Sequence, residues 1–200
     1  NELEKLNVPV LMETEVTPEL VKKENPDVIF AATGAEPIIP NIPGIDRPNV
    51  VTAHDVLGGK VNTGNRVVVM GGGCVGAETA NQLANYLKCV TIIEMLDAIA
   101  GDEIVVPRWD LLEDLDRNKV RICTKTTVDE ITDAGVKVSG AVNEVIPCDT
   151  VVLAVGAKPV LGLADALKKE GYDVRVIGDA AKVGLGGEAI MEGFEVGRTI

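Results

Sequence analysis

Short apolar runs alternate along the chain with segments of helical character. The run Val67–Met70 leads into a glycine-rich turn and a helix-like segment, and a second apolar run, Val90–Ile93, follows. Continuous apolar runs of this length are typical of strands that are buried on both faces of a parallel sheet. By the same reasoning we expect strands at Val8–Leu11 and Val120–Cys123 and an amphipathic helix at 108–119.

Two other apolar segments repeat one pattern. Residues 27–37 align without gaps with residues 149–159, and each segment predicts a buried strand that ends in a turn of small residues. Such strand ends are where α/β sheets place ligands, so Val155 and Gly156 are candidate binding residues. Between the two segments, alternating apolar and polar positions over 127–147 predict an antiparallel meander.

Proline and capping signals mark further boundaries. Thr17 precedes a proline and predicts the start of a short helix. A strand at 173–180 and a helix at 188–200 are expected near the end of the chain. Four prolines within 37–48 predict an extended connector, which indicates a crossing between domains.

The turn after Val67–Met70 carries the motif G-x-G-x-x-G. Gly71 makes the tight turn off the strand, Gly73 lets a pyrophosphate approach the backbone, and Gly76 allows the helix to pack closely on the sheet. The N–H groups and the positive dipole end of the helix then face the phosphates. A glycine turn without a ligand is the alternative, but the strand, helix and acidic residue around the motif favour a dinucleotide site. The candidate turn consists of Gly71, Gly72, Gly73, Cys74, Val75 and Gly76.

Glu94 ends the second apolar run, 21 residues past Gly73. A carboxylate at this place can accept hydrogen bonds from both ribose hydroxyls of an adenosine, whereas a 2'-phosphate would meet like charge. No Lys or Arg occurs from Glu94 through Pro107, so the sequence favours NAD(H) over NADP(H). Cys74 is either a reactive thiol at a helix N-terminus or, as we expect, a small residue that packs there.

Charge and composition restrict the partners. The net charge of −12 repels nucleic acid and anionic lipid, and no apolar stretch is long enough to span a bilayer. No signal peptide opens the sequence, so the cytoplasm is the expected location. The four cysteines form no C-x-x-C pair and there is one histidine, so neither a metal centre nor a dithiol redox centre is expected. Either a monomer or an oligomer fits this composition.

Two features have plain structural interpretations. His54 lies where a helix is expected to begin, and we predict it on the surface. Trp109, Leu112 and Leu115 recur at helical spacing and are expected to form one core-facing side of a helix.

Together these motifs resemble the two-dinucleotide-binding-domain flavoproteins, such as the pyridine nucleotide-disulfide oxidoreductases, over nearly the whole chain. In that family a strand ending in Ala-Thr-Gly, matched by Ala32, Thr33 and Gly34, leads from the FAD domain to the NAD domain. A late Gly-Asp, matched by Gly178 and Asp179, approaches the FAD. The resemblance implies an α/β fold with a Rossmann-like parallel sheet, an antiparallel three-stranded meander and a partial second domain of the FAD type. The expected parts are a first FAD-binding part at 1–60, an NAD(P)-binding domain at 61–160 and a C-terminal FAD-binding part at 161–200.

Within this family the phrases at 13–19, 35–40, 50–57 and 90–97 are most similar to 2-enoate reductases, 2,4-dienoyl-CoA reductases and related NADH:flavin oxidoreductases. Full-length relatives carry an N-terminal barrel with FMN and an iron–sulfur cluster. The chain starts at Asn1 in what resembles a helix already under way, so we expect a longer polypeptide with such a barrel as its partner. FMN and the cluster are expected only in that N-terminal region.

The resemblance implies that NADH passes a hydride to FAD and that the electrons then reduce an activated carbon–carbon double bond. The chemistry would belong to the cofactors, so no catalytic acid or base is expected in this chain. Glu78 either orients the nicotinamide, as in similar domains, or is a solvent-facing carboxylate that complements the helix dipole. The alternatives are a module that binds NAD(H) without catalysis, and a disulfide reductase or NADH oxidase, which the lack of a redox cysteine pair disfavours.

Overall fold

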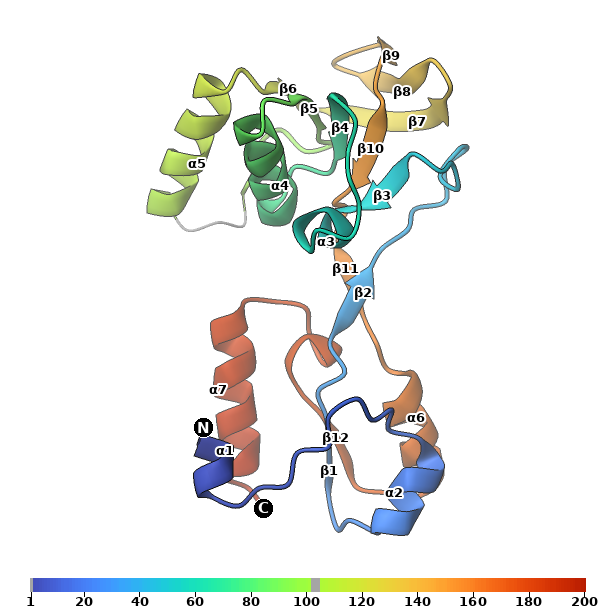
Figure 1. Ribbon diagram of the computed structural model, residues 1–200, viewed down its shortest axis with the longest axis vertical. Coiled ribbons are helices and arrows are strands. Elements are labelled where there is room, and N and C mark those ends of the chain that lie inside the picture. The colour runs from blue at the N-terminus through green and yellow to red at the C-terminus, as the bar shows by residue number, and fades with distance from the viewer. Residues whose placement is uncertain (1, 102–104) are drawn as a thin grey trace. The chain divides into compact units, whose positions relative to one another are not determined.

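The computed structural model describes residues 2–101 and 105–200. The chain forms two compact units, which we call the central unit, Glu36–Lys158, and the terminal unit, Asn1–Ala35 with Pro159–Ile200. Each unit has its own helices and strands (Figure 1). The chain therefore leaves the terminal unit once, completes the central unit and returns.

A five-stranded parallel sheet forms the middle of the central unit, in the order β3-β10-β4-β5-β6 (Figure 1). The strands are β3 (Val50–Thr52), β4 (Arg66–Met70), β5 (Cys89–Ile93), β6 (Arg121–Cys123) and β10 (Thr150–Leu153). The helices of this unit are α3 (Ala53–Leu57), α4 (Cys74–Asn85) and α5 (Val105–Arg117). The strands expected from the central apolar runs and the amphipathic helix are confirmed.

Successive valines of β4 contribute to two different cores. Val67 and Val69 pack with buried residues of the helices, including Ala80 of α4 and Leu115 of α5. Val68, between them, packs with the antiparallel strands on the other face of the sheet. Because both faces of the sheet are covered, the central positions of its strands are mostly apolar, and Thr91 of β5 is the polar exception among them.

The layer on the second face is the three-stranded meander that the alternation over 127–147 predicts. It is antiparallel and consists of β7 (Thr126–Thr132), β8 (Gly135–Gly140) and β9 (Glu144–Ile146). The register of β7 against β8 shifts between Val128 and Glu130, as at a β-bulge. Beyond the shift Ile131 is buried in the core beneath the sheet. The α/β fold class is thereby confirmed, with its parallel sheet and its antiparallel layer.

The terminal unit is built on two parallel strands, β1 (Ile29–Ala31) and β12 (Val174–Val176). Its helices are α1 (Glu2–Lys5), α2 (Pro18–Glu24), α6 (Gly162–Lys169) and α7 (Gly186–Gly197), with the 3-10 turn η1 (Gly178–Ala180) after β12. As the sequence predicts, Thr17 caps α2, and its hydroxyl oxygen accepts the N–H of Leu20 at 3.3 Å. The core of this unit is small and consists of Val21, Ala31, Ala164, Leu167 and Val174.

The repeated segments of the sequence take equivalent structures. β1 aligns with β10, and each is followed by a glycine with a positive φ, Gly34 at +72° and Gly156 at +98°. The next strands, β2 (Ala35–Pro37) and β11 (Ala157–Pro159), pair with each other and form the two crossings between the units. A salt bridge of 3.1 Å joins Lys158 to Glu36 across this pair.

Two expectations from the sequence were wrong. Val8–Leu11 forms no strand and is exposed, because no strand of the described residues pairs with its backbone. Trp109 is 73% exposed and does not belong to the core-facing side of α5, although Leu115 does. His54 is exposed near the start of α3, as expected. Across residues 2–101 and 105–200, no helix combines the length and apolar character needed to cross a bilayer.

Candidate dinucleotide-binding site

The glycine-rich turn joins β4 to α4 at the carboxyl end of the parallel sheet. Gly71 has a φ of +102° and donates its N–H to the carbonyl oxygen of Ile93 at 2.9 Å, which ties the turn to β5. A Cβ on residue 71 would overlap the carbonyl oxygen of Ala154. The positive φ and the close approach both require glycine at this position.

Gly73 precedes α4 and supplies no side-chain cap to the helix. Its φ of −63° and ψ of −176° describe an extended backbone that any residue can adopt. The first N–H groups of an α-helix have no carbonyl acceptor within the helix itself, and α4 begins at Cys74 with no side-chain cap from Gly73. With the dipole of α4 added, this end of the helix is suited to an anion.

Gly76 allows α4 to pack directly on the turn. A Cβ on residue 76 would overlap the carbonyl oxygen of Gly71 and lie 3.2 Å from the Cβ of Ala154. The N–H of Ala154 donates to the carbonyl oxygen of Met70 at 2.8 Å, so the ends of β10 and β4 are joined at this point. Two strand ends and the first turn of a helix therefore meet around the glycines.

Glu94 follows β5 and is only 8% exposed. One carboxylate oxygen accepts the N–H of Gly72 at 2.6 Å, and the other accepts the N–H of Leu96 at 2.7 Å. The sequence predicts this carboxylate as a partner of ribose hydroxyls but does not predict its bond to the turn, because that bond depends on how the chain folds back after β5. Each carboxylate oxygen has more than one lone-pair site, so both can still accept a ribose hydroxyl.

The chain after Glu94 folds back over the turn, and we call residues 95–101 the covering loop. The N–H of Ala100 donates to the carbonyl oxygen of Gly72 at 2.7 Å. Ile99 and Ala100 are both buried in the core shared with α4 and α5. Neither residue is among those that the sequence pointed to, and the short apolar run 98–100 is the one feature of the sequence that indicates their burial.

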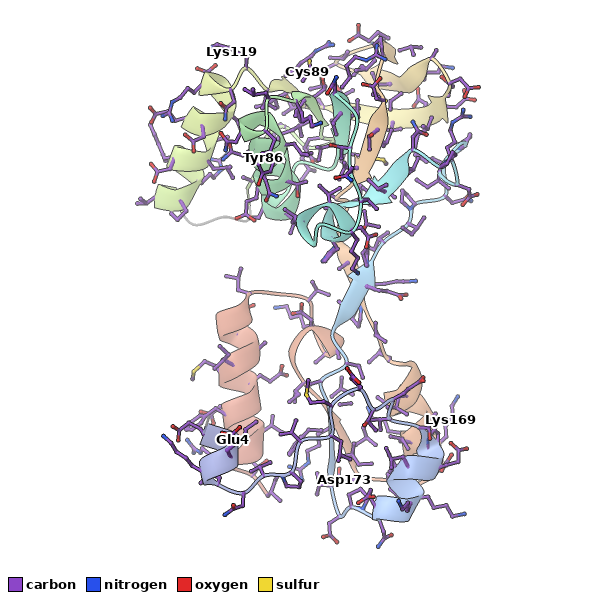
Figure 2. All side chains as sticks on the ribbon, viewed as in Figure 1. Glu4, Tyr86, Cys89, Lys119, Lys169 and Asp173 are labelled. Carbon is purple, nitrogen blue, oxygen red and sulfur yellow. The ribbon has the colours of Figure 1, made fainter. Side chains whose placement is uncertain are left out.

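The other predicted residues of the central unit lie at different distances from the turn. The backbone nitrogen of Val155 would lie 3.1 Å from a Cβ on Gly71, so Val155 adjoins the turn. Gly156 accepts the N–H of Ile38 at 3.0 Å and thereby begins the pairing of the connectors. Glu78 is exposed and lines a shallow hollow with residues of α4 and with Leu111 of α5. Tyr86, which Figure 2 labels, lines the same hollow.

The residues matched to an FAD site belong to the terminal unit. The hydroxyl of Thr33 donates to the carbonyl oxygen of Val160 at 2.5 Å, and the carbonyl oxygen of Gly34, two residues after Ala32, accepts the N–H of Val160 at 3.0 Å. The N–H of Gly178 donates to the carboxylate of Glu192 at 2.6 Å. The carboxylate of Asp179 accepts the N–H of Gly184 at 3.2 Å. These two turns follow β1 and β12, which are paired in parallel, so both lie at the carboxyl end of that pair.

None of the four cysteines is joined in a disulfide. Burial raises the pKa of the Cys123 and Cys148 thiols. A raised thiol pKa disfavours the thiolate, which is the reactive form. Cys74 is half-buried at the start of α4. In the part of the chain that the structure describes, no cluster of His, Cys, Asp and Glu could hold a metal ion.

Comparison with known proteins agrees with this geometry. A family described as pyridine nucleotide-disulphide oxidoreductase matches residues 10–179. The bilirubin reductase of Mediterraneibacter gnavus is 40% identical over 180 residues, which cover 90% of this chain and 28% of that protein. The NADH oxidase of Thermoanaerobacter brockii is 40% identical over 202 residues, which cover 98% of this chain and 31% of that protein. A solved 2-naphthoyl-CoA reductase in complex with 2-naphthoyl-CoA is 34% identical, with a TM-score of 0.92 over 100% of this chain and 31% of that chain.

The chain spans about three tenths of the length of these relatives. The family match covers both units, since it begins before α2 and ends within η1. Its members are oxidoreductases, and the family implies binding of FAD and NAD(P)H. The chain belongs to the pyridine nucleotide-disulphide oxidoreductase family.

Proposed function

We propose that the central unit binds NADH, with the diphosphate at the turn 71–76 and the adenosine ribose on Glu94. The observation that carries this proposal is the uncapped N-terminus of α4 beside a carboxylate that Gly72 and Leu96 already orient. A diphosphate at the helix end meets the positive end of its dipole, and the ribose hydroxyls donate to the carboxylate.

The preference for NADH over NADPH follows from the same carboxylate. Two backbone N–H groups hold Glu94 in place, so it cannot turn away from a 2'-phosphate without losing both hydrogen bonds. Residues 94–107 contain no Lys or Arg that would offset this repulsion.

We propose that the terminal unit contributes to an FAD site. The FAD-binding parts expected at 1–60 and 161–200 then precede and follow the NAD-binding part 61–160 in the sequence, and residues 36–60 of the first part lie in the central unit. The carboxylate of Glu192 on the Gly178 N–H shows that this N–H can bind an anionic oxygen, which a phosphate of FAD also offers. The turns that contain Gly34 and Asp179 lie at one end of a parallel strand pair, which is where α/β sheets bind ligands. Bound FAD would accept the hydride of NADH, while the chain positions the two cofactors.

For the longer protein we propose an enoate-reductase-like activity, in which the electrons reduce an activated carbon–carbon double bond. Two relatives are named as reductases of bilirubin and of 2-naphthoyl-CoA, both of which are conjugated molecules. FMN and an iron–sulfur cluster would reside in an N-terminal barrel of the same polypeptide. The absence of disulfides among the four cysteines fits a reducing compartment, which supports a cytoplasmic location.

A module that binds NAD(H) without catalysis is the second candidate, because every contact proposed for NADH lies in the central unit, which has its own core. Absorption spectra separate the two candidates. Purified protein that carries flavin absorption and loses it on addition of NADH supports the oxidoreductase. Colourless protein that still binds NADH supports the module.

The proposed coenzyme site is tested at Gly73. Gly73→Val should abolish NADH binding without unfolding the chain, because the backbone angles at this residue suit valine while the side chain would stand in the path of the diphosphate. Titration of NADH fluorescence measures the affinity, and circular dichroism checks the fold. Gly162→Val is the matched control, since a Cβ there meets no atom within 4 Å and lies in the terminal unit. Unchanged affinity in Gly73→Val would contradict the proposed site.

A further inference from the structure

The middle glycine of the turn uses both of its backbone groups inside the protein. The N–H of Gly72 donates to Glu94, and its carbonyl oxygen accepts the N–H of Ala100. Neither group is therefore left for a phosphate, although Gly72 lies between Gly71 and Gly73 of the motif. The conformation of the turn is thus set by Glu94 and the covering loop before any coenzyme binds.

The covering loop also fills the space beside Gly72. A Cβ on residue 72 would lie 2.6 Å from the Cγ2 of Ile99 and 3.0 Å from the Cβ of Glu94. The contact with Ile99 is shorter than real Cβ atoms show, so a side chain at position 72 would require Ile99 to move. Ile99 therefore packs where a side chain at position 72 would lie.

Arg108 holds this loop from the first turns of α5. Its Nε and Nη2 both donate to the carbonyl oxygen of Ile99, at 3.3 and 3.0 Å. Hydrogen bonds from a charged donor are stronger than neutral ones, and two donors on one carbonyl fix its direction. The next residue, Ala100, is the one that donates to Gly72. The chain of contacts therefore runs from Arg108 through Ile99 and Ala100 to the turn.

We propose that Arg108 is a positioning residue for the coenzyme: through the Ile99 carbonyl it holds the covering loop on Gly72 and so keeps the turn in the form that receives the diphosphate. This inference rests on the proposed function, because it needs NADH at the turn. Arg108 itself touches no part of the coenzyme in this account. It acts equally on NADH and NADPH, since both carry the same diphosphate.

The test compares Arg108→Met with Arg108→Lys in the whole chain. Loss of both hydrogen bonds in Arg108→Met should weaken NADH binding about tenfold, since a charge-assisted hydrogen bond is of that order. Arg108→Lys keeps the charge and one donor, and its affinity should lie between those of Arg108→Met and the wild type. The control is Arg117→Met on the same helix, whose guanidinium bonds only to Glu113 and Asp114 among the described contacts and should not change the affinity.

Two further measurements separate this role from other roles. The amide of Ala100 should exchange faster in Arg108→Met without NADH, and the ratio of the NADH and NADPH affinities should stay as in the wild type. A larger loss for NADPH would overturn the inference, because it would make Arg108 a direct ligand of the 2'-phosphate. The inference would also be overturned if folded Arg108→Met showed faster exchange at Ala100 but bound NADH within twofold of the wild-type affinity. If Arg108→Met does not fold, the same outcome in Arg108→Lys would overturn it. If the wild type itself does not bind NADH, the proposed function fails with it, which a titration of the unaltered chain shows first.

Discussion

At the scale of single residues, one carboxylate connects the glycine turn with the proposed ribose site. Glu94 is buried, and each oxygen of its carboxylate accepts one backbone N–H, from Gly72 and from Leu96. Removal of the carboxylate leaves two N–H groups without their acceptor and removes the negative charge that opposes a 2'-phosphate. For NADPH the first effect weakens binding and the second strengthens it. For NADH, whose ribose carries no 2'-phosphate, loss of the carboxylate only weakens binding.

Glu94→Ala should therefore weaken NADH binding by at least about tenfold and NADPH binding by less, which shifts the preference towards NADPH. The same change should lower the free energy of unfolding by about 1–3 kcal/mol, because two buried N–H groups lose their partner. Fluorescence titration with each coenzyme and urea denaturation measure the two effects. Asp110→Ala serves as control, since Asp110 is an exposed carboxylate on α5, outside the covering loop. An equal loss for both coenzymes would show that Glu94 does not contact the ribose.

The sequence predicted the type and place of Glu94 because the spacing from the glycines to the end of the next strand depends on the length of one helix and one turn. It could not predict the bond from Gly72, since this bond forms only when the covering loop folds back. The error at Trp109 has a related cause. Helical spacing shows which residues of α5 share a side, but not how far the neighbouring elements extend over its first turns.

At the scale of elements, an ion pair joins the starts of two neighbouring strands of the sheet, β4 and β10. Asp149, just before β10, accepts hydrogen bonds from the Nη2 of Arg66 at 2.6 Å and from the backbone N–H of Arg66 at 2.8 Å. The Nε of Arg66 and the N–H of Asn65 add two more donors, each at 3.1 Å. The Arg66 guanidinium first, and then these N–H groups, hold the pKa of Asp149 at about 2, below its ordinary value of 3.8. The pair fixes the start of β4 against the start of β10.

This pKa predicts a pH-dependent contribution to stability. Because the folded-state pKa is depressed, the contribution is complete above the ordinary pKa of 3.8 and disappears as the pH falls towards about 2. Asp149→Asn should thus lower the urea midpoint at pH near 6, and the difference from the wild type should shrink between about pH 4 and pH 2. Asp110→Asn, an exposed change on α5, controls for the loss of one negative charge. A difference that stays constant over this pH range would contradict the assignment.

The elements themselves show what an apolar pattern can and cannot predict. Val67–Met70 and Val90–Ile93 became strands because each lies between two layers and has a strand on both sides. Val8–Leu11 is equally apolar but stays exposed without a partner strand among the described residues. A strand needs a neighbour for its backbone hydrogen bonds, and the local sequence does not contain that neighbour.

At the scale of the whole molecule, the internal repeat explains how the two units are connected. The aligned segments 27–37 and 149–159 each supply a parallel strand, a glycine with positive φ and a short strand. The short strands β2 and β11 are the two crossings, and they pair with each other. The repeat was visible in the sequence, whereas the pairing of its two copies was not, since it joins residues more than a hundred positions apart.

Each core is made of residues from one unit, and the cores differ in size. The terminal unit has one small cluster around Leu167, while the central unit has two larger clusters on the two faces of its sheet. Because apolar burial is the main source of stability, the terminal unit should open at a lower urea concentration than the central unit.

Bound NADH should stabilise only the unit that contains its site, by about 2.7 kcal/mol at a concentration of about 100 times Kd. Hydrogen exchange with mass spectrometry, followed over a urea series, resolves the two units by their peptides. Peptides of β12 and α6 should exchange at lower urea concentration, and NADH should not change their exchange. Peptides of β4 and α4 should exchange at higher urea concentration, and NADH should slow their exchange. A single transition shared by all peptides, or equal protection of both sets by NADH, would mean that the two units unfold as one.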